Sequence, residues 1–104
     1  MTMAAKGLAK LAEECGELVA VIGKKLAYYH TDEHPDGAGS LSYRLEDEIA
    51  DVQASCLFAA GINGLDLGRI ADRTTEKLEL FCKWQEDPNN NKDGIDRPAM
   101  EDEE

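Results

Sequence analysis

Apolar residues recur along the chain at spacings of three and four, which is the period of an amphipathic helix. Three segments carry this pattern, at about residues 3–29, 42–60 and 66–85. No segment shows the strict alternation of a half-buried strand. We therefore expect an all-α fold, a short antiparallel helical bundle whose protomers assemble into an oligomer.

The apolar positions of each segment give the residues expected to face inward. A serine hydroxyl, that of Ser42, is expected to cap the second helix, Gly61 to end it, and Asp66 to cap the third. Residues 30–42, HTDEHPDGAGSLS, form a turn-rich linker. The expected inward stripes are Leu8, Leu11, Cys15, Leu18, Ile22 and Leu26; Leu45, Ile49, Val52, Cys56 and Ala59; and Ile70, Ala71, Thr74, Leu78 and Phe81.

Three glutamates interrupt the first segment where they do not help a helix. Glu13, Glu14 and Glu17 lie in its interior, and none stands four residues before a lysine or arginine. Glu13 and Glu17 are like charges four apart, an arrangement that costs a helix about 0.2–0.5 kcal/mol. A requirement other than helix formation is needed to explain them.

A second acidic pair occurs in the second segment, where Glu48 and Asp51 border the apolar stripe. Residues three apart share one helix face, as Glu14 and Glu17 also do. If the linker folds the two helices antiparallel, the two pairs can bring four carboxylates together beside the core. Because such charges are costly when desolvated and unpaired, a divalent cation is the simplest compensation. Ligation by oxygen alone favours Mg²⁺ or Mn²⁺.

The sequence around these acids resembles the MazG-like proteins, a family of all-α nucleoside triphosphate pyrophosphohydrolases. Residues 13–17 and 48–51 match the EExxE and ExxD signatures of that family, and their flanks, KLAEECGEL and LEDEIADV, are typical of it. The resemblance spans about residues 8–84 and includes NGLDLGRIADRTTEKLELF. Two features depart from it. The spacer of thirty residues is long, and we expect a helix that commonly precedes EExxE to be truncated or missing.

The resemblance implies hydrolysis of a (d)NTP between its α and β phosphates, giving a (d)NMP and pyrophosphate, a reaction suited to house-cleaning of the nucleotide pool. It implies that Mg²⁺, with Mn²⁺ as a substitute, is bound by Glu14, Glu17, Glu48 and Asp51. Glu13 is then a peripheral member of the catalytic group or a base that orients water.

Family members also bind phosphates through basic side chains, and the third segment offers candidates. Lys77 is the first choice and Arg73 the second, with Trp84 on the same helix edge. For Arg73 the role of a solvated surface residue stays open. Tyr28, Tyr29 and Trp84 are candidate platforms for base stacking or, alternatively, core or interface residues.

The net charge of −11 is unevenly distributed along the 104 residues. Residues 86–104 hold eight acidic and two basic residues, while residues 1–85 carry only −5. We expect one pyrophosphohydrolase domain at 1–85, followed by an acidic, mobile tail. So short a chain has a modest core, which favours a dimer or, more readily, a tetramer with active sites near the subunit interfaces.

The sequence also indicates where the protein works. It shows no apolar run long enough to span a bilayer and no signal peptide, so we expect a cytoplasmic protein with neither membrane nor nucleic acid as partner. Cys15, Cys56 and Cys82 lack metal-site spacing and are expected to be buried, reduced thiols. Residues 89–94 only faintly resemble a calcium loop, since Met100 stands where the last ligand, a glutamate, is needed.

Two alternatives remain open. Phosphoribosyl-ATP pyrophosphohydrolase shares the carboxylate scaffold, but its ExxD motif is followed by Tyr-His, where this chain has Val52-Gln53. A non-catalytic acidic helical binding protein would keep its carboxylates solvated, bind Mg²⁺ weakly and release no pyrophosphate. A di-iron site is disfavoured because it needs Glu-x-x-His on two helices.

Overall fold

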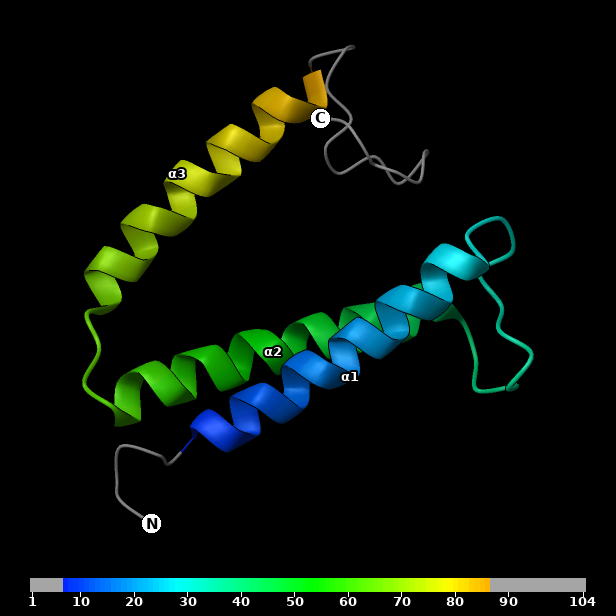
Figure 1. Ribbon diagram of the computed structural model, residues 1–104, viewed down its shortest axis with the longest axis horizontal. Helices are drawn as coiled ribbons and strands as arrows, with labels where there is room; N and C mark the ends of the chain where they lie inside the picture. The colour runs from blue at the N-terminus through cyan, green and yellow to red at the C-terminus, as the bar shows by residue number, and fades with distance from the viewer. Residues whose placement is uncertain (1–6, 87–104) are drawn as a thin grey trace. The chain divides into compact units, whose positions relative to one another are not determined.

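The computed structural model describes residues 7–86 (Figure 1). It contains three helices, α1 (Leu8–Ala27), α2 (Leu41–Ile62) and α3 (Leu67–Glu86), and no strand within that range. The all-α expectation is confirmed there. The predicted acidic tail beyond Glu86 and the calcium-like stretch lie outside the described residues. The chain divides into two compact units, with the boundary between Leu65 and Asp66.

The first unit is an antiparallel hairpin of α1 and α2, which run side by side in Figure 1. Its buried residues are mostly small, so the two helices can approach closely along Ala59 and Ala60. Leu41 is fully buried where α2 begins, and Val21 is buried on α1. The core is narrow, and it lies along one side of each helix.

The apolar stripes predicted for these helices are only partly inward. Leu18 and Val52 are half-buried between the helices, whereas Ile22 and Ile49 are largely exposed. Compared with the predicted stripe, the side of α1 that contacts α2 is shifted around the helix toward Glu14 and Val21. The shift arises because carboxylates as well as apolar side chains lie at the contact. Large apolar side chains therefore remain exposed on the hairpin: Leu8, Val19, Ile22, Leu26, Ile49, Leu57 and Phe58.

The expectation of buried thiols is wrong for the protomer. Cys15, Cys56 and Cys82 are all exposed and unpaired. Cys15 and Cys56 lie on the parts of the predicted stripes that turn away from the helix contact. An oligomer would cover such an apolar surface, and the oligomeric state stays a prediction.

Both helix starts differ from the expected positions. The first helix begins at Leu8 rather than near residue 3, because Gly7 has a left-handed backbone with φ 81°. Ser40, not Ser42, caps α2, with its hydroxyl accepting a hydrogen bond from the Tyr43 N–H at 3.2 Å. The helix also continues through Gly61 to Ile62.

The linker between α1 and α2 is ordered around Asp32. Its carboxylate accepts hydrogen bonds from Lys25 Nζ at 2.6 Å and from the hydroxyls of Ser40 and Ser42, both at 2.7 Å. The Lys25 hydrogen bond is the largest of several contributions that hold the pKa of Asp32 well below its usual range. This carboxylate ties the end of α1 to the start of α2.

A second carboxylate, Asp36, completes the linker. It accepts the Ala38 N–H at 3.0 Å and both terminal nitrogens of Arg44 at 3.2 Å, and it pairs with Lys24 at 3.4 Å. These contacts, the Ala38 N–H first among them, hold the pKa of Asp36 well below its usual range. Together the two aspartates fix the register in which α1 lies along α2.

The second unit is described through α3. The predicted cap is confirmed, since Asp66 Oδ1 accepts a hydrogen bond from the Arg69 N–H at 3.0 Å. No residue of α3 is buried, so its predicted apolar stripe, which includes Ile70, Leu78 and Phe81, is exposed. No helix among residues 7–86 is long and apolar enough to cross a membrane.

Candidate metal centre

Three carboxylates meet across the α1–α2 hairpin. Glu14, Glu17 and Glu48 each offer an oxygen, and these oxygens lie within 4.8 Å of one another. Glu14 and Glu17 are neighbours on one face of α1, as residues three apart are. Glu48 joins them from α2 because the ordered linker sets the register of the two helices.

Two oxygens of this group are buried without a partner among the described residues. Within residues 7–86, Oε1 of Glu14 and Oε1 of Glu48 have no hydrogen-bond donor. Buried carboxylate oxygens in a folded protein are nearly always hydrogen-bonded or bound to a metal, because their desolvation is otherwise uncompensated. The donor set is all oxygen and strongly anionic, which fits a hard divalent cation such as Mg²⁺ or Mn²⁺.

The pKa of Glu48 reflects its position among these carboxylates. Burial raises the pKa of its carboxyl above the ordinary value, and the neighbouring charges of Glu17, Asp51 and Glu14 raise it further. A cation held among these oxygens would act in the opposite direction and favour the ionised form.

The other two acids predicted for the site stand apart from this trio. Asp51 is exposed and close enough to influence Glu48, but it is not one of the three residues whose oxygens converge. The side chain of Glu13 is 56% exposed and bonded to Lys10 at 3.2 Å. Its carboxylate lies outside the trio, and its role in catalysis stays a prediction.

Lys10 is a site residue that the sequence reading missed. Its ammonium lies 3.4 Å from Glu14 Oε2 as well as 3.2 Å from Glu13. Hydrogen bonds to Glu13 and then to Glu14 raise its pKa. The signal was present, since Lys10 precedes these acids by three and four residues.

A surface hollow of about 330 Å³ lies beside the carboxylates. It has a charged side, an apolar side that includes the half-exposed ring of Phe58, and the buried Ser55, whose hydroxyl donates to the Val52 carbonyl at 3.0 Å. Its volume is within the range of small-ligand sites. The lining residues are Lys10, Glu14, Asp51, Ala54, Ser55 and Phe58.

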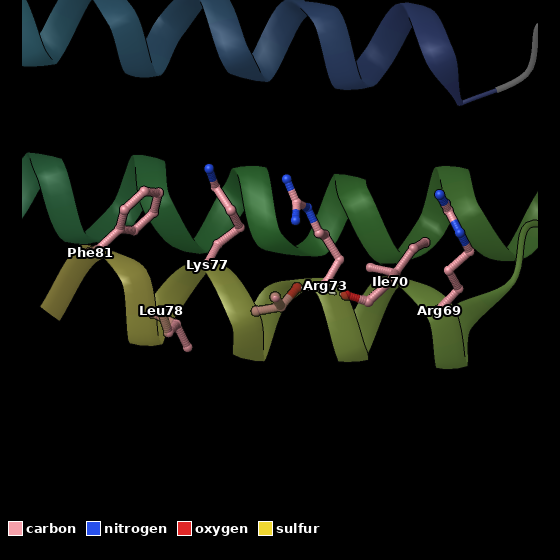
Figure 2. Close-up of a pocket in the computed structure, with 7 residues that line it drawn as sticks. Arg69, Ile70, Arg73, Lys77, Leu78 and Phe81 are labelled. Carbon is pink, nitrogen blue, oxygen red and sulfur yellow. Dashed lines mark hydrogen bonds between the residues drawn. The ribbon is translucent and has the colours of Figure 1, made fainter. Parts of the chain in front are cut away.

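The predicted phosphate ligands lie on α3, in the second unit. Figure 2 shows Arg69, Arg73 and Lys77 extending toward the same side of the helix. The Lys77 ammonium lies 5.1 Å from the centroid of the Phe81 ring and 5.8 Å from that of Trp84. Arg73 forms an exposed ion pair with Glu76 at 3.2 Å. A hollow of about 400 Å³ on this face is lined by these three cations and by the Phe81 ring.

The tyrosines considered for base stacking lie at the end of α1. Tyr28 is half-buried and makes an edge contact with His34, with centroids 4.9 Å apart. Tyr29 is exposed, and the centroid of its ring lies 5.5 Å from that of His30. Lys24 and Lys25, at the same end, are engaged by Asp36 and Asp32.

Comparison with known proteins gives one match. The family model of the MazG nucleotide pyrophosphohydrolase domain matches residues 4–84. No curated protein and no solved structure matches the chain.

Proposed function

The chain belongs to the MazG nucleotide pyrophosphohydrolase family, and from that premise we propose that it hydrolyses nucleoside triphosphates between the α and β phosphates. The products are a nucleoside monophosphate and pyrophosphate, and both ribo- and deoxyribonucleotides are candidate substrates. The observation that carries the proposal is the pair of buried, unpartnered oxygens on Glu14 and Glu48. Such oxygens are suitable ligands for a catalytic cation, whereas in a core with a purely structural role they would be destabilising.

The metal ligands proposed are Glu14, Glu17 and Glu48, with Asp51 as a fourth carboxylate at the margin of the trio. Mg²⁺ is the expected ion, and Mn²⁺ its substitute. A divalent ion bound there supplies neutralisation of the triphosphate charge and activation of water. The carboxylates fix the position of that chemistry on two helices whose register is set by Asp32 and Asp36.

The remaining residues have roles toward the nucleotide. The hollow beside the trio receives the nucleoside, with the Phe58 ring as an apolar wall against the base or sugar. Lys10 brings a positive charge to the same hollow and is a candidate phosphate ligand once Glu14 turns to a metal. Lys77 is proposed as a further phosphate ligand, with Arg73 beside it and Trp84 next to the Lys77 ammonium.

The exposed apolar surface of the hairpin supports assembly of protomers. We propose a homo-oligomer, a dimer or tetramer, that covers Leu8, Val19 and Ile22 of α1 and Ile49 of α2. We expect it to act in the cytoplasm on the nucleotide pool.

The test is pyrophosphate release from a panel of canonical and modified NTPs and dNTPs with Mg²⁺ or Mn²⁺. Phosphoribosyl-ATP belongs in the panel, because turnover of that compound alone would point to the related histidine-pathway enzyme. Glu17→Gln and Glu48→Gln should lose metal-dependent turnover. Glu46→Gln, an exposed acid on the same helix as Glu48, is the matched control and should keep it.

A further inference from the structure

Three cations form a row along α3. Arg69, Arg73 and Lys77 follow one another at intervals of four residues and extend to the same side of the helix (Figure 2). Four residues advance a helix by about 6 Å, so the charges recur at roughly that interval. The acidic residues of α3 lie off this row, at Asp72, Glu76, Glu79 and Glu86.

The row is poorly neutralised within the described residues. Arg73 pairs with Glu76, but both side chains are about two-thirds exposed. No ion pair to Arg69 or Lys77 occurs within residues 7–86; Lys77 instead lies over the rings of Phe81 and Trp84. This face therefore offers two to three cations and an aromatic edge to an anionic partner.

We propose that the occupant of this face is the acidic end of the same chain, residues 101–104, in the absence of nucleotide. Residues 87–104 hold seven acidic and two basic residues, and the last four, Glu101, Asp102, Glu103 and Glu104, are all acidic. These four residues are the longest run of acidic residues in the sequence, and residues 87–104 follow directly after the helix that carries the row.

Spacing favours this pairing. In an extended chain, side chains that point to one side recur every second residue, about 6.6 Å apart. That interval is close to the ~6 Å between successive cations of the row. Alternate carboxylates of residues 101–104 can therefore meet neighbouring cations without a change of α3.

The length of chain is also sufficient. Lys77 lies nine residues before Glu86, about 14 Å back along the helix axis. Glu101 stands fifteen residues after Glu86, and a random coil of that length has a root-mean-square span of roughly 20 Å. Such a tether gives the tail a local concentration on the order of millimolar at this face.

The consequence rests on the proposed function, in which Lys77 and Arg73 contact phosphates. The tail then competes with the triphosphate for the same cations and acts as a weak internal inhibitor. Exposed ion pairs contribute little individually and are screened by salt, so the nucleotide can displace the tail.

Docking is tested first without reference to activity, by zero-length carbodiimide cross-linking of the full chain and mass spectrometry. We expect cross-links from Lys77 to residues 101–104, fewer from Lys83, which is off the row but nearer the tail, and their loss in high salt. To learn whether the tail belongs to the same protomer, equal amounts of ¹⁴N and ¹⁵N chains are unfolded and refolded together before cross-linking. Contacts within one chain join only like isotopes. Absence of Lys77 cross-links would overturn the proposal. Cross-links of which half join unlike isotopes would also overturn it, because random mixing gives that proportion when every contact is between chains.

Trp84 gives an independent reading, because it is the only tryptophan and lies beside Lys77. A full-length variant with Glu101→Gln, Asp102→Asn, Glu103→Gln and Glu104→Gln should show stronger acrylamide quenching of Trp84 than the wild type. A control removes four exposed charges elsewhere, through Glu33→Gln, Glu46→Gln, Asp72→Asn and Glu79→Gln, and should quench like the wild type. Equal quenching in all three proteins contradicts docking.

Kinetics separate this inference from the proposed function. The tail variant should lower KM for nucleotide about threefold or more, with kcat little changed, because only a competitor for exposed cations is removed. An unchanged KM in an active enzyme rejects the tail as inhibitor. Lack of turnover in every protein, wild type included, rejects the proposed function and leaves the cross-linking result to decide on docking.

Discussion

Glu14 and Glu48 converge across the α1–α2 hairpin, and each keeps one buried carboxylate oxygen that has no hydrogen-bond partner in the described part of the chain. Like charges brought together in this way oppose folding unless a cation joins them. The hairpin holds them there through contacts at its far end, where Asp32 and Asp36 fasten the linker.

Divalent cations should stabilise the fold through these carboxylates. The thermal midpoint should rise with Mg²⁺ or Mn²⁺ by mass action, corresponding to about 2.7 kcal/mol at a free concentration one hundred times Kd. Differential scanning fluorimetry gives the measurement. Glu48→Gln should be at least as stable as the wild type without metal and should lose most of the response, while Glu46→Gln keeps it. An equal response of Glu48→Gln and wild type would remove Glu48 from the site.

Removal of the Lys10 ammonium should tighten metal binding. Lys10 pairs with Glu14 at 3.4 Å and thereby competes with a cation for that carboxylate. Because the pair is half exposed on the lysine side, the expected gain for Lys10→Gln is only a few-fold in Kd. Isothermal titration with Mn²⁺ measures it, with Lys83→Gln on α3 as the control for loss of one positive charge. Weaker binding by Lys10→Gln would show that Lys10 supports the metal site instead.

The stability of the hairpin should depend on pH through Asp32. Its pKa is lowered in the folded state from an ordinary value of 3.8, so its contribution is complete above about pH 4. That contribution is lost as the pH falls below 4 and through the lowered folded-state pKa. Urea unfolding at pH 7, 4 and 2.5 should show Asp32→Asn to be less stable than the wild type at pH 7. The difference should shrink at pH 2.5, whereas Glu79→Gln should track the wild type throughout. A difference that is independent of pH would exclude the carboxylate charge as its cause.

Gly7 should be intolerant of a side chain. Its φ of 81° is left-handed, and a Cβ would lie 3.2 Å from Ala59 Cα and from the Phe58 ring. Gly7→Ala should cost about 1–2 kcal/mol for the backbone conformation alone. Gly23→Ala is the matched control, because that glycine is inside α1 with open space around it; it should stabilise by about 0.5–1 kcal/mol. Chemical denaturation measures both, and a neutral Gly7→Ala would mean that α1 can begin in another conformation.

Helix content and the acidic trio could be read from the sequence because both depend on local spacing. Glu14 and Glu17 share a helix face wherever the helix begins and ends. Glu48 can reach them once its helix packs antiparallel to theirs. Asp51 has the same local spacing yet lies outside the converging oxygens. Its distance depends on how α2 is rotated against α1, which periodicity does not specify.

The linker shows what sequence reading could not provide. Composition indicated turns, but the hydrogen bonds of Asp32 to Lys25, Ser40 and Ser42 join residues from both helices. The sequence favoured Ser42 as the cap of α2, whereas it is the Ser40 hydroxyl that accepts the Tyr43 N–H. Both hydroxyls donate to Asp32, an arrangement that local spacing does not reveal. The exposure of Cys15 and Cys56 has a similar origin, since a wide apolar stripe does not reveal which of its edges meets the partner helix.

The most direct test of the account is identification of the phosphorus products by ³¹P NMR, with purified full-length protein, a preferred nucleoside triphosphate and Mg²⁺. The account predicts nucleoside monophosphate and pyrophosphate in equal amounts, formed only with a divalent cation and abolished in Glu17→Gln. Orthophosphate and nucleoside diphosphate as the products, or turnover that survives both chelation and Glu17→Gln, would contradict it.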